Sequence, residues 1–275
     1  MNTILVPTDF SPAADNALRY ALQLAALSGA EVVALHTVSL PLPAYAVQPE
    51  GMLEYNQYRV QEVREHFAAC HARYGDSGRF RTVLVNGRLV DSIVEKAQQY
   101  DADLVVMGTR GAEGIRTFIG TNAAAVLAAC PVPVLVVPEA YAGGLPARIV
   151  LAVQQEERES LLAPVFRLRG LCGAGLRTVH FTEEETSPVE RSRQEYALGS
   201  LSRKWQQDFG SETVESALIA GADFNETLER YVHEEGVNLV AMITHRKKGL
   251  PGIFQKSLTR ERAFHTGVPL LSLHA

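Results

Sequence analysis

Apolar runs of strand length alternate with helical patterns along the first half of this chain. The strand-like runs are residues 3–6, 32–38, 80–85, 103–107 and 132–137, and the helical patterns are 13–28, 52–74, 90–100 and 122–130. Ser11 and Pro12 mark the start of the helix predicted over 13–28, and Gly29 marks its end. Strands rich in Val and Leu that alternate with helices predict a parallel sheet with helices on both faces.

The second half of the chain repeats this plan. Strands are expected there at 148–153, 176–182, 213–219, 238–243 and 268–273, with a long charged helix over 188–209. Four pairs of segments match in the same order, namely 4–9 with 149–154, 33–36 with 177–180, 103–107 with 238–242, and 132–136 with 268–272. We therefore predict an α/β chain of two tandem Rossmann-like domains, residues 1–140 and 146–275, each with a five-stranded, mainly parallel sheet.

The last strand predicted in each domain is apolar. An exposed apolar edge strand is an aggregation hazard, and the second copy of the domain can cover it. We therefore expect the strands at 132–137 and 270–273 to pair about a pseudo-twofold axis. Such an intramolecular pseudo-dimer leaves open whether whole chains also form a homodimer.

Charge and cysteine usage narrow the class of protein. The formal net charge of -5 and a pI near 5.9 argue against a nucleic-acid-binding surface, which normally carries a basic excess. The three cysteines lie far apart without a C-x-x-C pair, so neither a zinc site nor a disulfide framework is indicated. No run approaches the ~20 apolar residues of a membrane span, and the N-terminus lacks a signal-peptide pattern. We expect a soluble cytoplasmic protein.

Candidate chemistry lies after the strand predicted over 103–107. The glycine-rich stretch 108–114 follows that strand, and Gly120, Thr121 and Asn122 then lead into a helix. A glycine-rich loop that feeds a helix N-terminus presents backbone N–H groups to an anion such as phosphate. The spacing matches neither the Walker motif nor the dinucleotide-binding fingerprint. Ligands of parallel sheets bind where carboxyl ends of strands meet at a switch point, and Asp9 lies at another such end.

The motifs resemble those of the universal stress protein family. They are the opening segment 4–11, the glycines Gly108 and Gly111, the pair Gly120 and Thr121, and the Pro-Val strand 131–137. The family signature is G-x-x-G, a spacer of nine and G-[ST], and the spacer here, 112–119, is one residue shorter. The resemblance extends over essentially the whole chain, with one copy of the family's domain in each half, and implies the adenine nucleotide alpha hydrolase-like fold.

The resemblance also implies a ligand and a role. In nucleotide-binding members, the residue matching Asp9 lies near the adenosine, the one matching Val38 flanks the base, and the glycines hold ribose and phosphates. The implied site residues are Pro7, Thr8, Asp9, Val38, Met107, Gly108, Arg110, Gly111, Gly120, Thr121 and Asn122. The implied ligand is ATP, ADP or AMP. Asp9 is a candidate to hold Mg²⁺ on the phosphates, although a single carboxylate is a weak metal site. The implied role is stress-response regulation through an unidentified protein partner.

The second copy departs from the motif at each key position. Gln154 replaces Asp9, Ile243 replaces Gly108, Arg246 replaces Gly111, and Gln255 falls opposite Gly120. Side chains at these positions would fill the space that a backbone cradle offers to phosphate. We infer that the second domain has lost the nucleotide-binding mode and is a degenerate partner of the first.

Other interpretations stay open at this point. The site could belong to a slow ATPase, or the shortened spacer could mark a nucleotide-free interaction module. No catalytic residue is assigned, because the chain has no G-x-S-x-G motif and the glycine loop lacks the lysine of an NTPase. Asp9 could instead cap the next helix, in competition with Ser11. The basic run 246–248 is either a solvated loop or an anion site.

The histidines indicate a functional site less clearly than the glycine-rich stretch does. His66, Cys70 and His71 share one predicted helix, but their spacing is poor for a metal because positions 70 and 71 point about 100° apart. His36 and His180 end matching strands of the two copies. This placement indicates an inherited packing or hydrogen-bonding role rather than catalysis.

Overall fold

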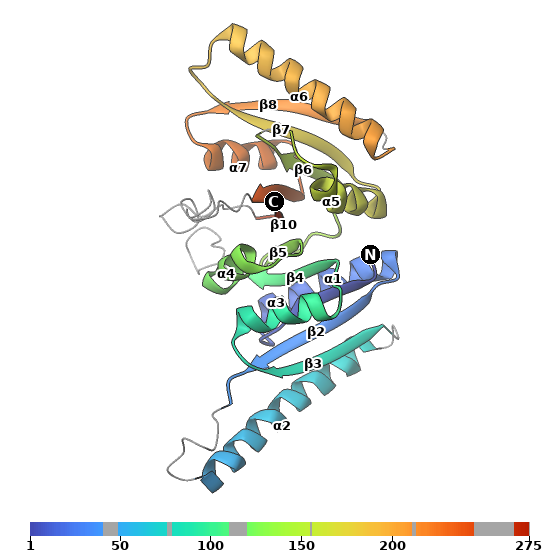
Figure 1. Cartoon of the computed structure of the whole chain (residues 1–275), viewed down its shortest axis with the longest axis vertical. Coiled ribbons are helices and arrows are strands. Elements are labelled where there is room, and N and C mark those ends of the chain that lie inside the picture. The colour runs from blue at the N-terminus through green and yellow to red at the C-terminus, as the bar shows by residue number, and fades with distance from the viewer. Residues whose placement is uncertain are drawn as a thin grey trace.

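A single ten-stranded sheet runs along the length of the protein (Figure 1). The structure is a computed structural model that describes residues 1–40, 49–75, 79–109, 120–154, 156–210, 213–244 and 267–274, with side chains except at 49 and 50. The strand order is β3-β2-β1-β4-β5-β10-β9-β6-β7-β8. Every neighbouring pair is parallel except β5 and β10, which are antiparallel.

The elements of the first half follow the predicted alternation. They are β1 (Thr3–Pro7), α1 (Pro12–Ser28), β2 (Glu31–Val38), α2 (Pro49–Tyr74), β3 (Phe80–Asn86), α3 (Leu89–Gln99), β4 (Leu104–Thr109), α4 (Thr121–Ala129) and β5 (Val134–Pro138). Those of the second half are β6 (Arg148–Ala152), α5 (Glu159–Cys172), β7 (Gly175–Glu183), α6 (Pro188–Asp208), β8 (Val214–Gly221), α7 (Phe224–Glu234), β9 (Leu239–Thr244) and β10 (Leu270–His274). The predicted α/β fold is confirmed.

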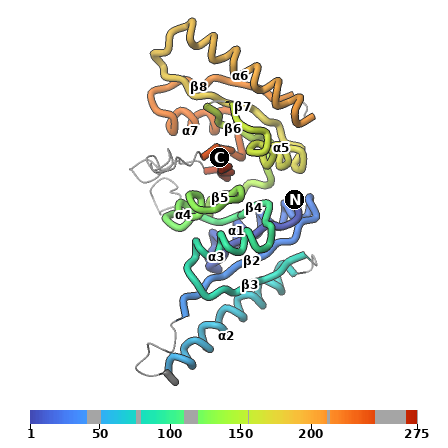
Figure 2. Tube along the Cα trace, in the orientation of Figure 1, coloured from blue at the N-terminus to red at the C-terminus, as the bar shows by residue number. Residues whose placement is uncertain are grey.

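Each half of the sheet has the same strand order, counted outward from the seam, which is the β5–β10 pair where the two halves meet. β5, β4, β1, β2 and β3 in the first half correspond to β10, β9, β6, β7 and β8 in the second. Figure 2 shows the early part of the chain forming one half and the later part forming the other. The order matches the four pairs of similar segments found in the sequence.

Helices cover both faces of the sheet. In the first half α1 and α2 pack on one face, and α3 and α4 pack on the other. In the second half α5 and α6 share the face of α1, whereas α7 packs on the opposite face. This two-sided cover explains why the central strands consist of continuous apolar runs. None of the helices in the described ranges is both long and apolar enough to cross a lipid bilayer.

The two halves share one hydrophobic core across the seam. β10 pairs with β5 in a register that places Leu270 opposite Val136 and Leu271 opposite Leu135. These are the two edge strands that the sequence singled out. On one face, α1 and α5 lie side by side, and a single buried cluster includes Leu24 of α1 and Leu162 of α5. Burial of these side chains therefore depends on both halves.

The same backbone support recurs at the start of each half. The Asp103 carboxylate accepts a hydrogen bond from the N–H of Thr3 (3.3 Å), and the Asn238 side-chain oxygen accepts one from Arg148 (2.9 Å). These two residues are counterparts in the repeat. Asp103, unlike the uncharged Asn238, also forms an ion pair across the seam, with Arg167 of α5 (2.8 Å).

Candidate functional site

Strands β1 and β4 are paired only at their beginnings. Their register contains two residue pairs, Ile4 with Leu104 and Leu5 with Val105. On its other side, β1 pairs with β2 through to Pro7, and β4 pairs with β5 through to Thr109. The hydrogen-bonded ladder between β1 and β4 therefore ends before the carboxyl ends of the strands, at the switch point of the sheet, which is where ligands of such folds bind.

Proline explains why the ladder ends early. The N–H of Thr8 donates to the carbonyl of Leu35 in β2 (2.8 Å). Neighbouring residues of a strand direct their backbone groups to opposite sides, so the nitrogen of Pro7 faces β4. Proline has no N–H to donate, and the ladder between β1 and β4 cannot continue there.

The equivalent strands of the second half remain paired. β6 and β9 form four residue pairs, from Ile149 with Leu239 to Ala152 with Met242. Ala152 takes the place of Pro7 and supplies an N–H group. The two halves thus differ at the position where the sequence predicts a ligand site in the first half alone.

Close packing against α1 requires glycine at position 108. A Cβ atom placed on it would lie 2.2 Å from the carbonyl oxygen of Ala13 and 2.9 Å from the nitrogen of Ala14. Both atoms belong to the backbone of α1, which therefore crosses directly over β4. From the sequence, glycine was expected at this position because a phosphate approaches the backbone. The close approach of α1 is sufficient to explain why the residue is glycine.

The second half has a side chain at the position equivalent to Gly108. The connection between β6 and α5 (153–158) is two residues longer than that between β1 and α1 (8–11). Ile243, the counterpart of Gly108, packs its side chain against the shared core. The change from glycine to isoleucine therefore accompanies a later start of the covering helix.

Gly120 is different, because nothing in the described structure requires glycine there. Its φ is -57°, and an added Cβ would have only the Thr109 hydroxyl oxygen near it, at 3.9 Å. Gly120 is the N-cap residue of α4 and provides no side-chain cap. Thr121 and Asn122 follow it in the first turn and are exposed. A helix start with this cap is suited to an anionic ligand.

The turn between β1 and α1 carries Asp9. The side chain of Ser11 caps α1 by accepting the N–H of Ala14 (3.3 Å). The Asp9 carboxylate accepts the N–H of Ser11 (3.0 Å), and the residue is exposed at the end of β1. Ser11 is thus the N-cap, which settles the competition between the two residues.

Phe10 lies in an unusual backbone conformation beside Asp9. Its φ is +63°, a left-handed value that is rare for an aromatic residue. Its ring is stacked between His36 (4.7 Å between centroids) and His66 (4.6 Å). The Thr8 hydroxyl oxygen accepts the N–H of Phe10 (3.0 Å). These contacts hold the turn that presents the Asp9 carboxylate.

The paired histidines have the role that the sequence indicated. Nδ1 of His36 donates to the carbonyl of Thr8 (2.7 Å), and Nδ1 of His180 is 3.1 Å from the carbonyl of Val153. Burial lowers the pKa of His36, although the bond to Thr8 opposes that effect. In each half, a histidine on the second strand supports the end of the first strand.

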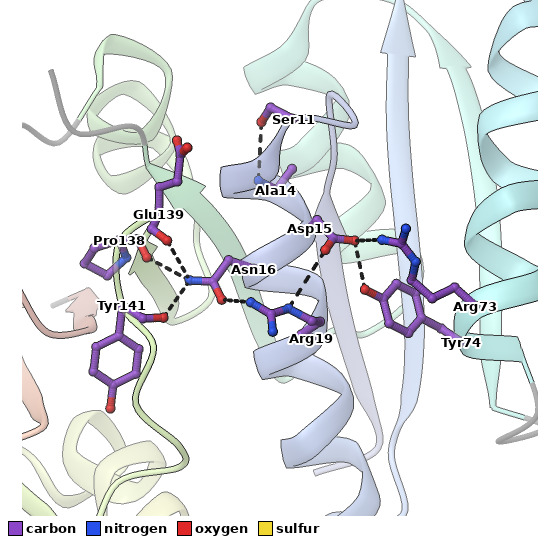
Figure 3. A network of polar contacts seen from close by, with 10 residues as sticks. All are labelled: Ser11, Ala14, Asp15, Asn16, Arg19, Arg73, Tyr74, Pro138, Glu139 and Tyr141. Carbon is purple, nitrogen blue, oxygen red and sulfur yellow. Dashed lines mark hydrogen bonds and ion pairs between the residues drawn. The ribbon is translucent and has the colours of Figure 1, made fainter. Parts of the chain in front are cut away.

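Asn16 of α1 fixes the segment that follows β5 (Figure 3). Its side-chain amide nitrogen donates to the carbonyl oxygens of Pro138 (2.9 Å), Glu139 (3.3 Å) and Tyr141 (2.9 Å). Its oxygen accepts a hydrogen bond from Arg19 (2.7 Å). The buried amide therefore holds α1 against the end of β5.

Most of the expected site residues lie at one edge of the sheet. Pro7, Thr8 and Asp9 end β1, Val38 ends β2, and Met107 and Gly108 lie in β4, while Gly120, Thr121 and Asn122 begin α4. Arg110 and Gly111 fall outside the described residues, as do Arg246 and Gln255. We refer to the described set as the first strand-end site.

The described residues do not bring three metal-ligating side chains of His, Cys, Asp or Glu together. His66 and His71 are directed to different partners, because the first stacks on Phe10 and the second contacts the Thr82 hydroxyl (3.2 Å). The metal interpretation of the histidines on α2 therefore has no support from their contacts.

The family model described as "Universal stress protein family" matches residues 1–138. The chain belongs to the universal stress protein family. A universal stress protein of Thermus aquaticus is 33% identical over 138 residues, which are 49% of this chain and 97% of the relative. Universal stress protein G of Salmonella typhimurium is 30% identical over 145 residues, which cover 97% of that relative. These relatives match half of this chain.

Solved structures resemble the whole chain. A universal stress protein of Archaeoglobus fulgidus superposes with a TM-score of 0.73 at 16% identity, over 98% of this chain and 97% of that one. One of Pseudomonas aeruginosa, whose assignment to the family is putative, gives 0.64 at 16% identity, over 100% and 93% of the two chains. At such low identity, the likeness establishes the fold alone.

Two residues that organise the first strand-end site are not among those predicted from the sequence. Thr109 lies between two motif glycines and has no assigned role in the motif. Its hydroxyl oxygen accepts the N–H of Gly120 (3.1 Å). Asn16 is a polar residue on the buried, apolar face of α1, which could have indicated a buried amide with specific partners.

Proposed function

We propose that this universal stress protein binds one adenine nucleotide, ATP or AMP, at the first strand-end site. The observation that carries the proposal is the contrast between the two halves. The hydrogen-bonded register of β1 and β4 ends after two residue pairs, at Pro7, whereas that of β6 and β9 runs over four. Membership of a family whose nucleotide-binding members use these positions supports the same assignment.

The residues divide into two groups around the strand ends. The first turn of α4, which follows Gly120, provides backbone N–H groups for the phosphates, together with the adjoining motif residues Arg110 and Gly111. Asp9 is the carboxylate assigned to the adenosine side or to a Mg²⁺ ion held with the phosphates. Val38, which is buried at the end of β2, flanks the base.

The second half, residues 146–275, acts in this proposal as a degenerate partner of residues 1–140. Pairing of β5 with β10 places the two halves as an intramolecular pseudo-dimer. Occupancy of the first strand-end site by nucleotide is then a regulatory signal of the stress response, which a protein partner reads in the cytoplasm.

A substitution at Gly120 tests the ligand directly. In Gly120→Asp the new carboxylate caps α4 and interacts favourably with the helix dipole, so the nucleotide-free protein should gain about 0.5 kcal/mol of stability. The same negative charge occupies the place assigned to phosphate. Gly120→Asn is the matched control, because it caps the helix without adding the charge.

The measurement is the melting temperature of ligand-stripped protein with and without millimolar Mg-ATP. A ligand present at ~100 times its Kd adds about 2.7 kcal/mol to the stability of the native state. We expect ATP to raise the melting temperature of the unsubstituted protein, to raise that of Gly120→Asn less, and to leave that of Gly120→Asp unchanged. A protein that shows no shift with ATP, ADP or AMP would contradict the proposal.

A further inference from the structure

Thr109 joins three elements at the first strand-end site. It is the last residue of β4 and is only 5% exposed. Its hydroxyl oxygen accepts the N–H of Gly120, at 3.1 Å, and its carbonyl oxygen accepts the N–H of Glu139, at 3.0 Å. One residue thus connects the end of β4 to the start of α4 and to the end of β5.

The connection continues into α1. The carbonyls of Pro138 and Glu139 accept the side-chain amide of Asn16, as Figure 3 shows. Through Glu139, Thr109 therefore fixes the start of α4 relative to the helix that follows Asp9. The adenosine side and the phosphate side of the proposed site share one hydrogen-bonded support.

The bond to Thr109 also determines what α4 offers to a ligand. A serine or aspartate at the N-cap would use its side chain to accept N–H groups of the first turn. Gly120 cannot do so, and the Thr109 hydroxyl takes the N–H of Gly120 itself. The helix start is held in place while the amides of its first turn are left to other partners.

The counterpart residue in the second half has a different partner. Thr244 occupies the equivalent position in β9, but its hydroxyl donates to the carbonyl of Leu273 in β10 (2.7 Å). The same residue type supports a neighbouring strand in one half and the start of a helix in the other. The difference coincides with the shorter hydrogen-bonded register of β1 and β4.

We propose that Thr109 is a positioning residue for the phosphates of the bound nucleotide. The inference rests on the proposed function and adds a residue that acts through Gly120 and the first turn of α4. Removing the hydroxyl should weaken binding of a nucleoside triphosphate more than binding of the nucleoside, because the support lies on the phosphate side alone.

The test compares Thr109→Val with two controls. Valine keeps the shape of threonine and removes the oxygen that accepts the N–H of Gly120. Thr109→Ser restores that oxygen, and Thr244→Val makes the same change at the counterpart position. Titration calorimetry with Mg-ATP and with adenosine gives the ratio of the two affinities, and amide exchange of residues 120–124 in the nucleotide-free protein reports the start of α4.

We expect Thr109→Val to bind ATP about tenfold more weakly, a loss of about 1.4 kcal/mol, with adenosine affinity within about twofold of the unsubstituted protein. Its amides at 120–124 should exchange faster. Thr109→Ser should restore ATP binding, and Thr244→Val should not alter it. An equal loss for ATP and adenosine would reduce Thr109 to general structural support and overturn the inference.

Unchanged affinities of Thr109→Val for both ATP and adenosine would also overturn the inference, while leaving the nucleotide function intact. If the unsubstituted protein bound neither ATP nor adenosine, the proposed function itself would be refuted, and the role of Thr109 in it would be refuted as well.

Discussion

Replacing Gly108 by alanine should destabilise the protein even when no nucleotide is present. The added Cβ would lie 2.2 Å from the carbonyl oxygen of Ala13 and 2.4 Å from its carbon. A close carbon-to-oxygen contact in proteins is about 3.3 Å. The start of α1 would have to move by about 1 Å relative to β4. Neither contact can be relieved by rotating a side chain, because both atoms belong to the helix backbone.

The expected loss follows from the cost of overpacking. Extra methyl groups in a tightly packed site cost about 1–3 kcal/mol, and the rigid backbone contact places Gly108→Ala toward the upper end. Gly170 of α5 is the matched control, because an added Cβ there meets no atom of the described residues within 4 Å. Gly170→Ala should stabilise the protein by about 0.5–1 kcal/mol, since alanine is the better helix former.

Urea unfolding of both variants, followed by circular dichroism, measures the two changes. Gly108→Ala should lower the free energy of unfolding by about 2–3 kcal/mol, and Gly170→Ala should raise it. If Gly108→Ala were as stable as the unsubstituted protein, the close approach of α1 to β4 would be incorrect. The outcome matters for function, because weaker nucleotide binding by a Gly108 variant is expected from altered packing alone.

Three further substitutions test the polar contacts that support the site and the seam. Asn16→Ala removes the amide that donates to the carbonyls of Pro138, Glu139 and Tyr141, of which Pro138 keeps the N–H of Tyr141 as a donor, and should cost about 1–3 kcal/mol in urea unfolding at neutral pH. For Asp103, burial raises the carboxyl pKa, but backbone N–H groups and Arg167 outweigh it, so the pKa lies below its ordinary value. The stabilisation is present above the unfolded-state pKa, near 3.9, and is lost as pH falls through the folded pKa. Asp103→Asn should therefore be less stable than the unsubstituted protein by up to about 1 kcal/mol at pH 7, with a smaller difference at pH 3. For His36, the lowered pKa means that stability is lost as pH falls below about 6.5. His36→Asn should flatten that slope in melting temperatures measured from pH 7 to pH 5.

Local patterns in the sequence were sufficient to predict the strands and helices. Ser11, Pro12 and Gly29 bound α1 as expected, because caps and turn residues act on their own neighbourhood. The repeated segments were sufficient to predict which strands are equivalent. The partner of each edge strand followed from its apolar character, and β5 does pair with β10.

The details of the first strand-end site depend on contacts between residues far apart in the chain. The early end of β1–β4 pairing reflects Pro7, whose missing N–H becomes significant only once its side of the sheet is known. The contact between Gly108 and Ala13 requires the path of α1 across β4. Thr109 meets Gly120 across eleven positions of sequence. No periodicity marks such pairs, and only tertiary structure brings them together.

In the proposed function, nucleotide binds in the first half of the chain and not in the second. Titration calorimetry of ligand-stripped protein with Mg-ATP tests this claim most directly, because it measures the number of sites per chain. We expect one ATP per chain, and none in Gly120→Asp. Two ATP molecules per chain would show that the second half still binds nucleotide, and no binding by the unsubstituted protein would contradict the site itself.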